Sequence, residues 1–504
     1  MTSPDRSDRR FSDAGGSRRR SGLWLGPALA LATYAALSAS ALSHPGRAVA
    51  AVAVLMGVLW LTEAVPIPAT ALLPIALLPL LTGGEIGVRA VAAPYAHDLI
   101  FLFMGGFLLA LGMERWGLHR RVALHIILAI GDRPSTVVLG FMVASAFLSM
   151  WISNTATVVM MLPIALSVVE LVRARLEGSD AVGRGEFHFA IALLLGVAYG
   201  ASIGGTATLI GTPPNLMLAA FVADNLEGEI TFGSWLPLGL PFAWGLLPMA
   251  WLVLVRVVYP IRVREIPGGR AFIREELRRC GPMRWAERLV LLVFLFAAGA
   301  WILRSPLAGV TVGGIQPFAG LTDAGIGIFA ALLLFVLPAP GEGGERLLDW
   351  EHAVKLPWGV LLLFGGGLSL AEAMQRGGVD SFVGDQIARF EGVPDLGLMA
   401  LVSGVVLLLT EMTSNTATTA TFLPILAASA EGLGVDPIRL VVPAALAASC
   451  AFMMPVATPP NAIVFASGEL TIRQMCRAGI WLNSIALAWI LVLVTLFGDR
   501  LPGL

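Results

Sequence analysis

Charged residues are scarce in this chain. They make up 13% of its 504 residues, whereas hydrophobic residues make up 57%. A soluble protein carries about 25% charged residues. Apolar runs long enough to cross a lipid bilayer, roughly 20 residues each, recur from one end of the sequence to the other. The composition therefore predicts an all-α polytopic membrane protein, embedded in a bilayer and with no nucleic-acid partner.

Cysteine and histidine are also rare. The three cysteines (Cys280, Cys450 and Cys476) are far apart, and the six histidines form no His-x-x-x-His or His-x-x-Glu-His pattern. Neither set predicts a metal site or a disulfide framework. A Walker-type phosphate loop is missing too, so ATP hydrolysis is not expected. An enzyme would need a cluster of acid, base, metal or nucleophile groups at membrane depth, and the sequence offers no such cluster.

Small polar residues stand out against this apolar background. The pentapeptide Ser-Asn-Thr-Ala-Thr occurs at 153–157 and again, 261 positions later, at 414–418. Each copy lies inside an apolar stretch and is followed by Leu-Pro-Ile. Polar side chains in lipid-length segments are costly unless they bind something, and a matched pair in two halves is typical of a site at a repeat interface.

Two further blocks repeat in the same order. Phe-Met-Gly-Gly at 103–106 matches Phe-Gly-Gly-Gly at 364–367, and Thr-Pro-Pro-Asn at 212–215 matches the same letters at 458–461. Five crossings per copy would give the two copies opposite orientations in the membrane. We therefore predict an inverted-topology repeat, divided as follows: a disordered cytoplasmic tail (1–22), an extra first transmembrane helix (23–43), a first repeat (44–260), a basic cytoplasmic linker (261–285) and a second repeat (286–504).

Segment lengths and charges predict the topology. The stretches 135–173 and 396–430 are too long for one crossing and too short for two, so we expect two re-entrant hairpins with the Ser-Asn-Thr blocks at their tips, beside about 11 transmembrane helices. The stretches 98–130, 188–224 and 357–390 are also long. The region 261–288 carries eight arginines against four glutamates. The positive-inside rule makes it cytoplasmic and places the N-terminus inside.

The proline blocks predict broken helices. Proline lacks the N–H that a helix needs, and its ring clashes with the preceding turn. The carbonyls freed before a break can coordinate a cation, and the N–H groups that open the next half-helix can hold an anion. Ser-Asn-Thr supplies hydroxyl and amide groups for either ion. Since no Arg or Lys lies in these blocks, a buried anion there would be offset by helix ends and by co-bound cations.

These blocks resemble the divalent anion/sodium symporter family of INDY-type di- and tricarboxylate transporters, from about residue 45 to the end. Trp-Leu-Thr-Glu-Ala-Val-Pro-Ile-Pro at 60–68 resembles the entry signature of that family. The resemblance implies an elevator-type homodimer. It implies one sodium site from Ser149, Ser153, Asn154 and Gly211, and a second from Thr410, Thr413, Asn415 and Ala457. It implies dicarboxylate contacts from Asn154, Thr155, Thr212, Pro213, Asn415, Thr416, Thr458 and Pro459.

The expected function is secondary active transport of C4 dicarboxylates, such as succinate, malate or fumarate, by sodium symport across the cell's inner (plasma) membrane. A sodium-independent exchanger, or a carrier of citrate or sulfate, remains an alternative, and a channel or membrane enzyme fits the sequence less well. Glu411, beside the second block where the first has Met150, is either a proton or cation partner or a residue hydrogen-bonded within its hairpin.

Overall fold

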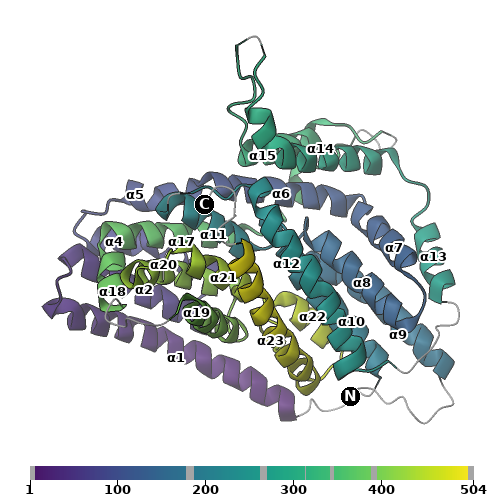
Figure 1. Cartoon of the computed structure of the whole chain (residues 1–504), viewed down its shortest axis with the longest axis horizontal. Helices are drawn as coiled ribbons and strands as arrows, with labels where there is room; N and C mark the ends of the chain where they lie inside the picture. Colours follow the sequence, from purple (N-terminus) through teal and green to yellow (C-terminus); the bar gives the residue numbers. More distant parts are fainter. Residues whose placement is uncertain are drawn as a thin grey trace.

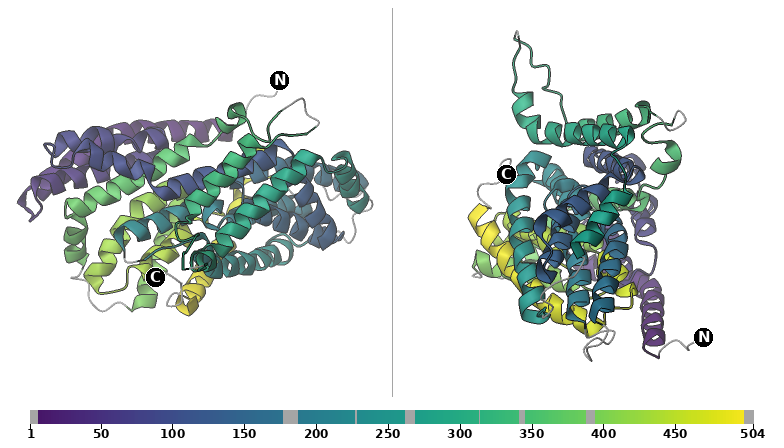
Figure 2. Two further views of the ribbon diagram at one scale, coloured as in Figure 1. Left: turned by 90° about the horizontal axis from the view of Figure 1, so that it is seen from above. Right: turned by 90° about the vertical axis from the view of Figure 1, so that its right-hand side faces the viewer.

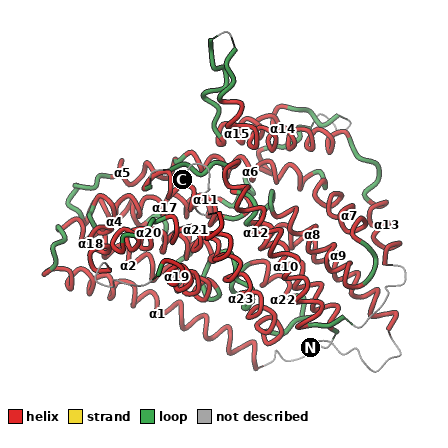
Figure 3. Tube along the Cα trace, viewed as in Figure 1, coloured by secondary structure: helices red, strands yellow, loops and turns green. Residues whose placement is uncertain are grey.

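The computed structural model describes residues 6–176, 187–226, 228–261, 269–312, 314–340, 345–387 and 394–497. In these ranges helices make up most of the chain, and loops of differing length join them (Figure 3). Up to the linker the helices are α1 (Arg6–Ala36), η1 (Leu37–Ala39), α2 (His44–Thr62), α3 (Ile67–Thr70), α4 (Leu73–Leu81), α5 (Val88–Ala92), η2 (Ala93–Ala96), α6 (Asp98–Arg115), α7 (Leu118–Ile130), α8 (Pro134–Ser149), α9 (Asn154–Leu176), α10 (His188–Gly205), η3 (Leu209–Gly211), α11 (Pro213–Asn225), α12 (Phe232–Leu252) and η4 (Val253–Val258).

The remaining helices belong to the linker and the second half. They are α13 (Gly269–Arg279), α14 (Trp285–Ala308), α15 (Asp323–Val336), α16 (Trp350–Ala353), α17 (Trp358–Arg376), α18 (Val379–Ile387), α19 (Asp395–Thr410), α20 (Asn415–Leu433), α21 (Ile438–Ala448), α22 (Pro459–Ala466) and α23 (Ile472–Phe497). The first helix, α1, begins at Arg6, upstream of the first span expected at 23–43.

Eight helical stretches among the described residues are long and apolar enough to cross a membrane. Five shorter apolar stretches of 10–17 residues accompany them, and these include α8, α19 and α21. A short helix reaches only part of the way across a bilayer, because each residue adds about 1.5 Å. Since α8 and α19 end at the two hairpin turns and α21 ends at the second break, these three short helices would place those polar segments at membrane depth.

Two of the long stretches expected from sequence are bent at glycine. The stretch 98–130 forms α6 and α7, which are separated at Gly117 (φ 71°), and 357–390 contains α17 and α18, which are separated at Gly378 (φ 66°). Both glycines adopt the left-handed conformation that other residues rarely enter. The matched positions of Gly117 and Gly378 in the two halves are therefore a feature of the repeat.

Each half contains one helical hairpin packed against one broken helix. The first hairpin consists of α8 and α9, joined at residues 150–153, and α8 packs along α10. The second consists of α19 and α20, joined at 411–414, and α19 packs along α21. In Figure 1 the second hairpin lies to the left of α21, α23 and α12, and the first hairpin lies to their right, together with α10.

The two halves exchange their broken helices. After the first break, α11 packs against α20 of the second hairpin, and after the second break, α22 packs against α9 of the first. A hydrogen bond of 2.7 Å from the Tyr199 hydroxyl to the Phe452 carbonyl joins α10 to the second break. Both breaks therefore lie at the interface between the repeats, where the duplicated blocks predict a site.

The helices α14 and α15 form a layer beside this core. They contact α6, and in Figure 2 (right) they lie along one side of the molecule. The contact between α6 and α15 is close because glycine faces glycine: a Cβ placed on Gly105 would lie 2.5 Å from the backbone carbon of Gly327. Gly105 belongs to the glycine block repeated in α17, so this block serves helix packing.

Candidate functional site

The first hairpin places an oxygen cluster at its turn. Ser149 ends α8 and Asn154 begins α9, and the Ser149 hydroxyl donates a short hydrogen bond to Asn154 Oδ1. A Cβ built on Gly205 would lie 2.5 Å from Asn154 Oδ1 and 3.0 Å from the Gly211 carbonyl oxygen. A Cβ on Gly211 would lie 2.9 Å from the Ser149 carbonyl oxygen. Hydroxyl, amide and carbonyl oxygens of the hairpin and of the broken helix therefore meet in a space that only glycine leaves open.

The second hairpin repeats this cluster with different residues. Thr410 ends α19, and its hydroxyl oxygen lies 2.7 Å from Asn415 Oδ1 and 2.8 Å from the Ala448 carbonyl oxygen. Thr410 is completely buried. One hydroxyl has a single proton to donate, so it cannot satisfy both acceptors fully. Three oxygens drawn together around one proton are suited to a hard cation such as sodium, which prefers oxygen ligands.

The hydroxyls of Ser153 and Thr413, two of the sodium ligands expected from the family, form hydrogen bonds within their own hairpins. Ser153 Oγ accepts a hydrogen bond from the Ala156 N–H (3.2 Å) in the first turn of α9. Thr413 Oγ1 lies 2.9 Å from the Leu409 carbonyl oxygen and 2.6 Å from Thr418 Oγ1. Both residues lie at the hairpin turns, but their hydroxyls stabilise the turn instead of joining the oxygen cluster. Ala457, the counterpart of Gly211, is buried directly before Thr458.

Each helix break is held open by an asparagine. Asn215 Nδ2 donates to the carbonyls of Thr206 (3.0 Å) and Thr208 (2.8 Å). Asn461 Nδ2 does the same for Ala451 and Met454, both at 3.0 Å. Both asparagines are fully buried. They are the last residues of the two Thr-Pro-Pro-Asn blocks, so the repeat itself could have identified them as structural members of the site.

The residues expected to contact the dicarboxylate lie at helix N-termini. Asn154 and Thr155 open α9, and Asn415 and Thr416 open α20. Thr212 and Thr458 are extended N-caps, directly followed by Pro213 and Pro459 as the first residues of α11 and α22. Four helices thus begin at the hairpin turns and the breaks. The N–H groups that open α9 and α20 are suited to an anion. In contrast, α11 and α22 each begin with two prolines, which have no N–H, so they offer an anion only the positive ends of their helix dipoles.

The N-terminal turns of α11 and α20 are neighbours. A Cβ placed on Gly367 of α17 would lie 3.2 Å from both Met217 and Ala420 side-chain carbons. Met217 is in the second turn of α11, and Ala420 is in the second turn of α20. The structure therefore brings the start of the first broken half-helix close to the start of the second hairpin helix, as a site shared between the repeats requires.

Glu411 is bonded outside its own hairpin. Its Oε1 accepts from the N–H groups of Phe452 (2.7 Å) and Met453 (2.9 Å), and its Oε2 accepts from Met453 and Met454, both at 3.0 Å. Asn483 of α23 donates to Oε1 at 2.6 Å. The expectation of a hydrogen bond confined to the hairpin is therefore wrong, because the freed N–H groups of the second break are the stronger partners.

The first half replaces this carboxylate with a simpler contact. At the position that matches Glu411 it has Met150, whose carbonyl accepts a hydrogen bond of 2.5 Å from the Thr208 hydroxyl. Both halves thus tie the hairpin turn to the facing break, one through a carboxylate and the other through a threonine. Among the described residues, no group of three or more His, Cys, Asp or Glu side chains gathers to hold a metal.

A three-glycine spacing in α10 was not recognised from sequence. Gly196, Gly200 and Gly204 follow one another at intervals of four along the face that meets α8. Cβ atoms built there would lie 2.9 Å from Met142 Cγ and 2.6 Å from the Met142 carbonyl at the first two positions, and would overlap the backbone of Ala146 at the third. The spacing is the known signal for close helix contact. The second half has no such glycine series.

The chain matches known transporters over nearly all its length. Residues 27–504 fit the sequence model of the family described as sodium:sulfate symporter transmembrane region. The sodium-dependent dicarboxylate transporter SdcS of Staphylococcus saprophyticus is 42% identical over 480 residues, covering 94% of this chain and 90% of that protein. SdcS of Staphylococcus aureus is 43% identical over 477 residues, with the same coverage.

Two solved structures share the fold at low sequence identity. The YdaH transporter of Alcanivorax borkumensis superposes with a TM-score of 0.52 and 14% identity, covering 91% of this chain and 98% of that one. MtrF of Neisseria gonorrhoeae gives a TM-score of 0.56 and 12% identity, covering 93% and 98%. At this identity the likeness concerns the arrangement of helices alone.

Proposed function

Because this chain belongs to the sodium:sulfate symporter family, we propose that it carries small dicarboxylates, such as succinate, malate or fumarate, across the membrane together with sodium. The observation that carries the proposal is the pair of oxygen clusters at the hairpin turns, each beside the start of a proline-broken half-helix. The relatives that share more than two fifths of its residues are named sodium-dependent dicarboxylate transporters.

The chemistry of the site explains why anion and cation would travel together. The blocks that form it contain no Arg or Lys. A dianion placed among the helix N-termini receives only partial positive charge, roughly half an elementary charge per helix. Sodium ions held by Ser149 and Asn154, and by Thr410 and Asn415, would supply the missing charge. Each ion thereby lowers the cost of burying the other, which makes transport of either one alone unfavourable.

The two carboxylates of a C4 acid fit the symmetry of the site. One carboxylate would meet Asn154 and Thr155, and the other Asn415 and Thr416. Thr212 and Thr458, at the starts of α11 and α22, would add hydroxyl contacts, with Pro213 and Pro459 shaping the walls. Binding would join the two hairpins through one small molecule, since each hairpin packs on the broken half-helix of the other repeat.

The proposal also includes how the protein moves and assembles. The hairpins and broken helices would move together as an elevator against α6, α14, α15 and α17, in a homodimer of the plasma membrane. The N-terminus would be cytoplasmic, as the arginine-rich region before α14 predicts. The close glycine contact of α8 with α10 supports their moving as one body, because a helix pair packed at backbone distance does not separate easily.

Transport by purified protein in liposomes tests the function. We expect labelled succinate to accumulate under an inward sodium gradient, and excess malate or fumarate to compete with it. Accumulation without sodium that depends on internal dicarboxylate would identify an exchanger instead. Competition by sulfate or citrate, but not by C4 acids, would contradict the proposed cargo.

A further inference from the structure

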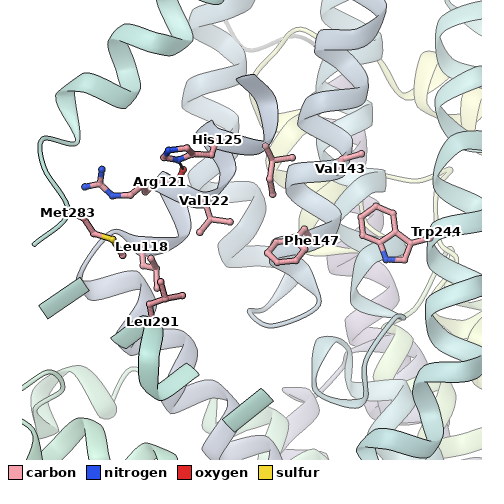
Figure 4. A pocket seen from close by; sticks show the side chains of 10 residues that line it. Leu118, Arg121, Val122, His125, Val143, Phe147, Trp244, Met283 and Leu291 are labelled. Carbon is pink, nitrogen blue, oxygen red and sulfur yellow. Dashed lines mark hydrogen bonds between the residues drawn. The ribbon is translucent and has the colours of Figure 1, made fainter. Parts of the chain in front are cut away.

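A pocket outside the transport site opens between the first hairpin and its surroundings. It has a volume of about 430 Å³ and is formed by α7, α8, α12 and the start of α14 (Figure 4). Its lining residues are Leu118, Arg121, Val122, His125, Ile126, Val143, Phe147, Trp244, Met283 and Leu291. Eight of these ten are apolar, so the pocket offers water little to bond with. A space of this size greatly exceeds the roughly 30 Å³ share of one water molecule.

The polar rim lies on one side, at the ends of α7 and α14. Arg121 already has its partners there: it bonds both carboxylate oxygens of Glu287, at 2.8 and 3.1 Å, and the carbonyls of Cys280 and Gly281. The charges of Arg121 and Glu287 therefore neutralise one another, and their hydrogen bonds fix the position of Arg121 at the edge of the pocket.

Arg288 gives this edge a net positive charge. It is exposed and stands three positions before Leu291, on the same face of α14, and Leu291 lines the pocket. His125, on α7, is a further exposed group at the rim. Trp285, 54% exposed on the first turn of α14, is the residue type enriched at the membrane surface. An apolar pocket below a positive rim at headgroup level complements a lipid that has an anionic headgroup.

We propose that this pocket binds an anionic phospholipid, with one acyl chain between α8 and α14 and its phosphate beside Arg288. The rim belongs to the arginine-rich side that the positive-inside rule places in the cytoplasm, where the leaflet is rich in anionic lipid. The headgroup is selected by charge, and the chain by burial of its methylene groups against Val143, Phe147 and Leu291.

The lipid would contact the first hairpin but would lie outside the transport site. Phe147 lines the pocket and stands two residues before Ser149, where α8 ends at the first oxygen cluster. The acyl chain would therefore fill the gap between the hairpin and α14. This inference concerns lipid binding alone and holds whichever anion is carried.

Native mass spectrometry of the full chain, released from membranes of phosphatidylcholine and phosphatidylglycerol, tests the proposal. We expect wild type to retain phosphatidylglycerol in preference to phosphatidylcholine. Arg288→Gln should weaken that retention roughly fivefold, the effect of one arginine near an anionic lipid. Arg274→Gln is the matched control and should change nothing, because Arg274 is an exposed arginine of α13, a helix that contributes no lining residue to the pocket.

A second variant tests separately whether the pocket holds the acyl chain of the lipid. Leu291→Trp fills the pocket and should lower retention of phosphatidylglycerol while leaving Arg288 in place. Equal retention by wild type and Arg288→Gln, or equal losses in Arg288→Gln and Arg274→Gln, would overturn the proposal. Full retention by a folded Leu291→Trp protein would also overturn it. Succinate uptake is measured in parallel, so a failure of lipid binding is distinguished from a failure of the proposed transport.

Discussion

The Thr410 hydroxyl oxygen lies 2.7 Å from the side-chain oxygen of Asn415, across the turn of the second hairpin. The Ala448 carbonyl oxygen lies 2.8 Å away on the other side. Both neighbours are acceptors, and a threonine has one proton. A cation among the three oxygens would make this arrangement favourable, and we propose that a sodium ion lies there.

Thr410→Val should therefore weaken sodium binding. Valine keeps the shape of threonine but removes the oxygen. An interaction with a charged group contributes about 1.5–3 kcal/mol, so the sodium concentration for half-maximal succinate uptake should rise roughly tenfold to a hundredfold. Thr421→Val is the matched control, because Thr421 is in the same hairpin but bonds only the Ala417 carbonyl of its own helix. Similar sodium dependence in both variants would remove Thr410 from the site.

Gly211→Ala should disable the first cluster. Its new methyl group would lie 2.9 Å from the Ser149 carbonyl oxygen and closer still to Gly205, so the oxygens must move apart. Overpacking of this kind costs about 1–3 kcal/mol, and sodium-driven uptake should fall roughly tenfold or more. The control uses the matching position in the other half: Ala457→Gly should retain uptake. Normal sodium activation in Gly211→Ala would show that this glycine does not border the ion.

Glu411→Gln should destabilise the second break. A glutamine amide brings an N–H₂ group among the N–H donors of Phe452, Met453 and Met454, so at least one donor loses its acceptor. A buried donor without a partner costs about 1–3 kcal/mol. We expect a lower unfolding temperature and weaker sodium activation, because the same segment leads to Ala457 and Thr458.

Glu372→Gln provides the comparison for Glu411. Glu372 forms an ion pair with Arg376 on the surface of α17, and surface pairs of this kind contribute about 0.3–0.5 kcal/mol. Its removal should leave unfolding temperature and transport nearly unchanged. If both variants unfold at the wild-type temperature, the bonds of Glu411 do not hold the break in place.

A link between His97 and Asp224 should show whether the hairpins and broken helices move against α6. His97 Nε2, before α6, lies 3.1 Å from Asp224 Oδ1, near the end of α11. If α11 moves against α6 during transport, a covalent link between these positions will stop it. We expect His97→Cys combined with Asp224→Cys to lose succinate uptake after a short bifunctional thiol reagent, and each single variant to keep it. Continued uptake by the linked protein would exclude relative movement at this point.

The repeated motifs predict the hairpin turns and the helix breaks well. Both Ser-Asn-Thr blocks stand at a hairpin turn, with Asn154 and Asn415 as the first helical residues, and both Thr-Pro-Pro-Asn blocks begin a half-helix. These features are local, because proline and short polar side chains act on their own segment of backbone. Local chemistry is what a single sequence shows most directly.

The partners across the site could not be predicted in the same way. The Ala448 carbonyl that approaches Thr410, and the Asn483 amide that binds Glu411, come from other helices and carry no sequence pattern. A backbone carbonyl is the same in every residue, so its role depends on tertiary packing. The glycine series of α10 is different, since its spacing was readable and identifies the helix that holds the first hairpin.

The exchange of half-helices between the repeats has a consequence for biogenesis. When the first hairpin and α11 leave the ribosome, the partners that will cover them, α22 and α20, have not been made. Until then, the faces of α9 and α11 that these partners will cover must lie against lipid, water or the insertion machinery. The transporter can therefore reach its native state only after the last fifth of the chain has been synthesised, although most of its membrane crossings are complete long before.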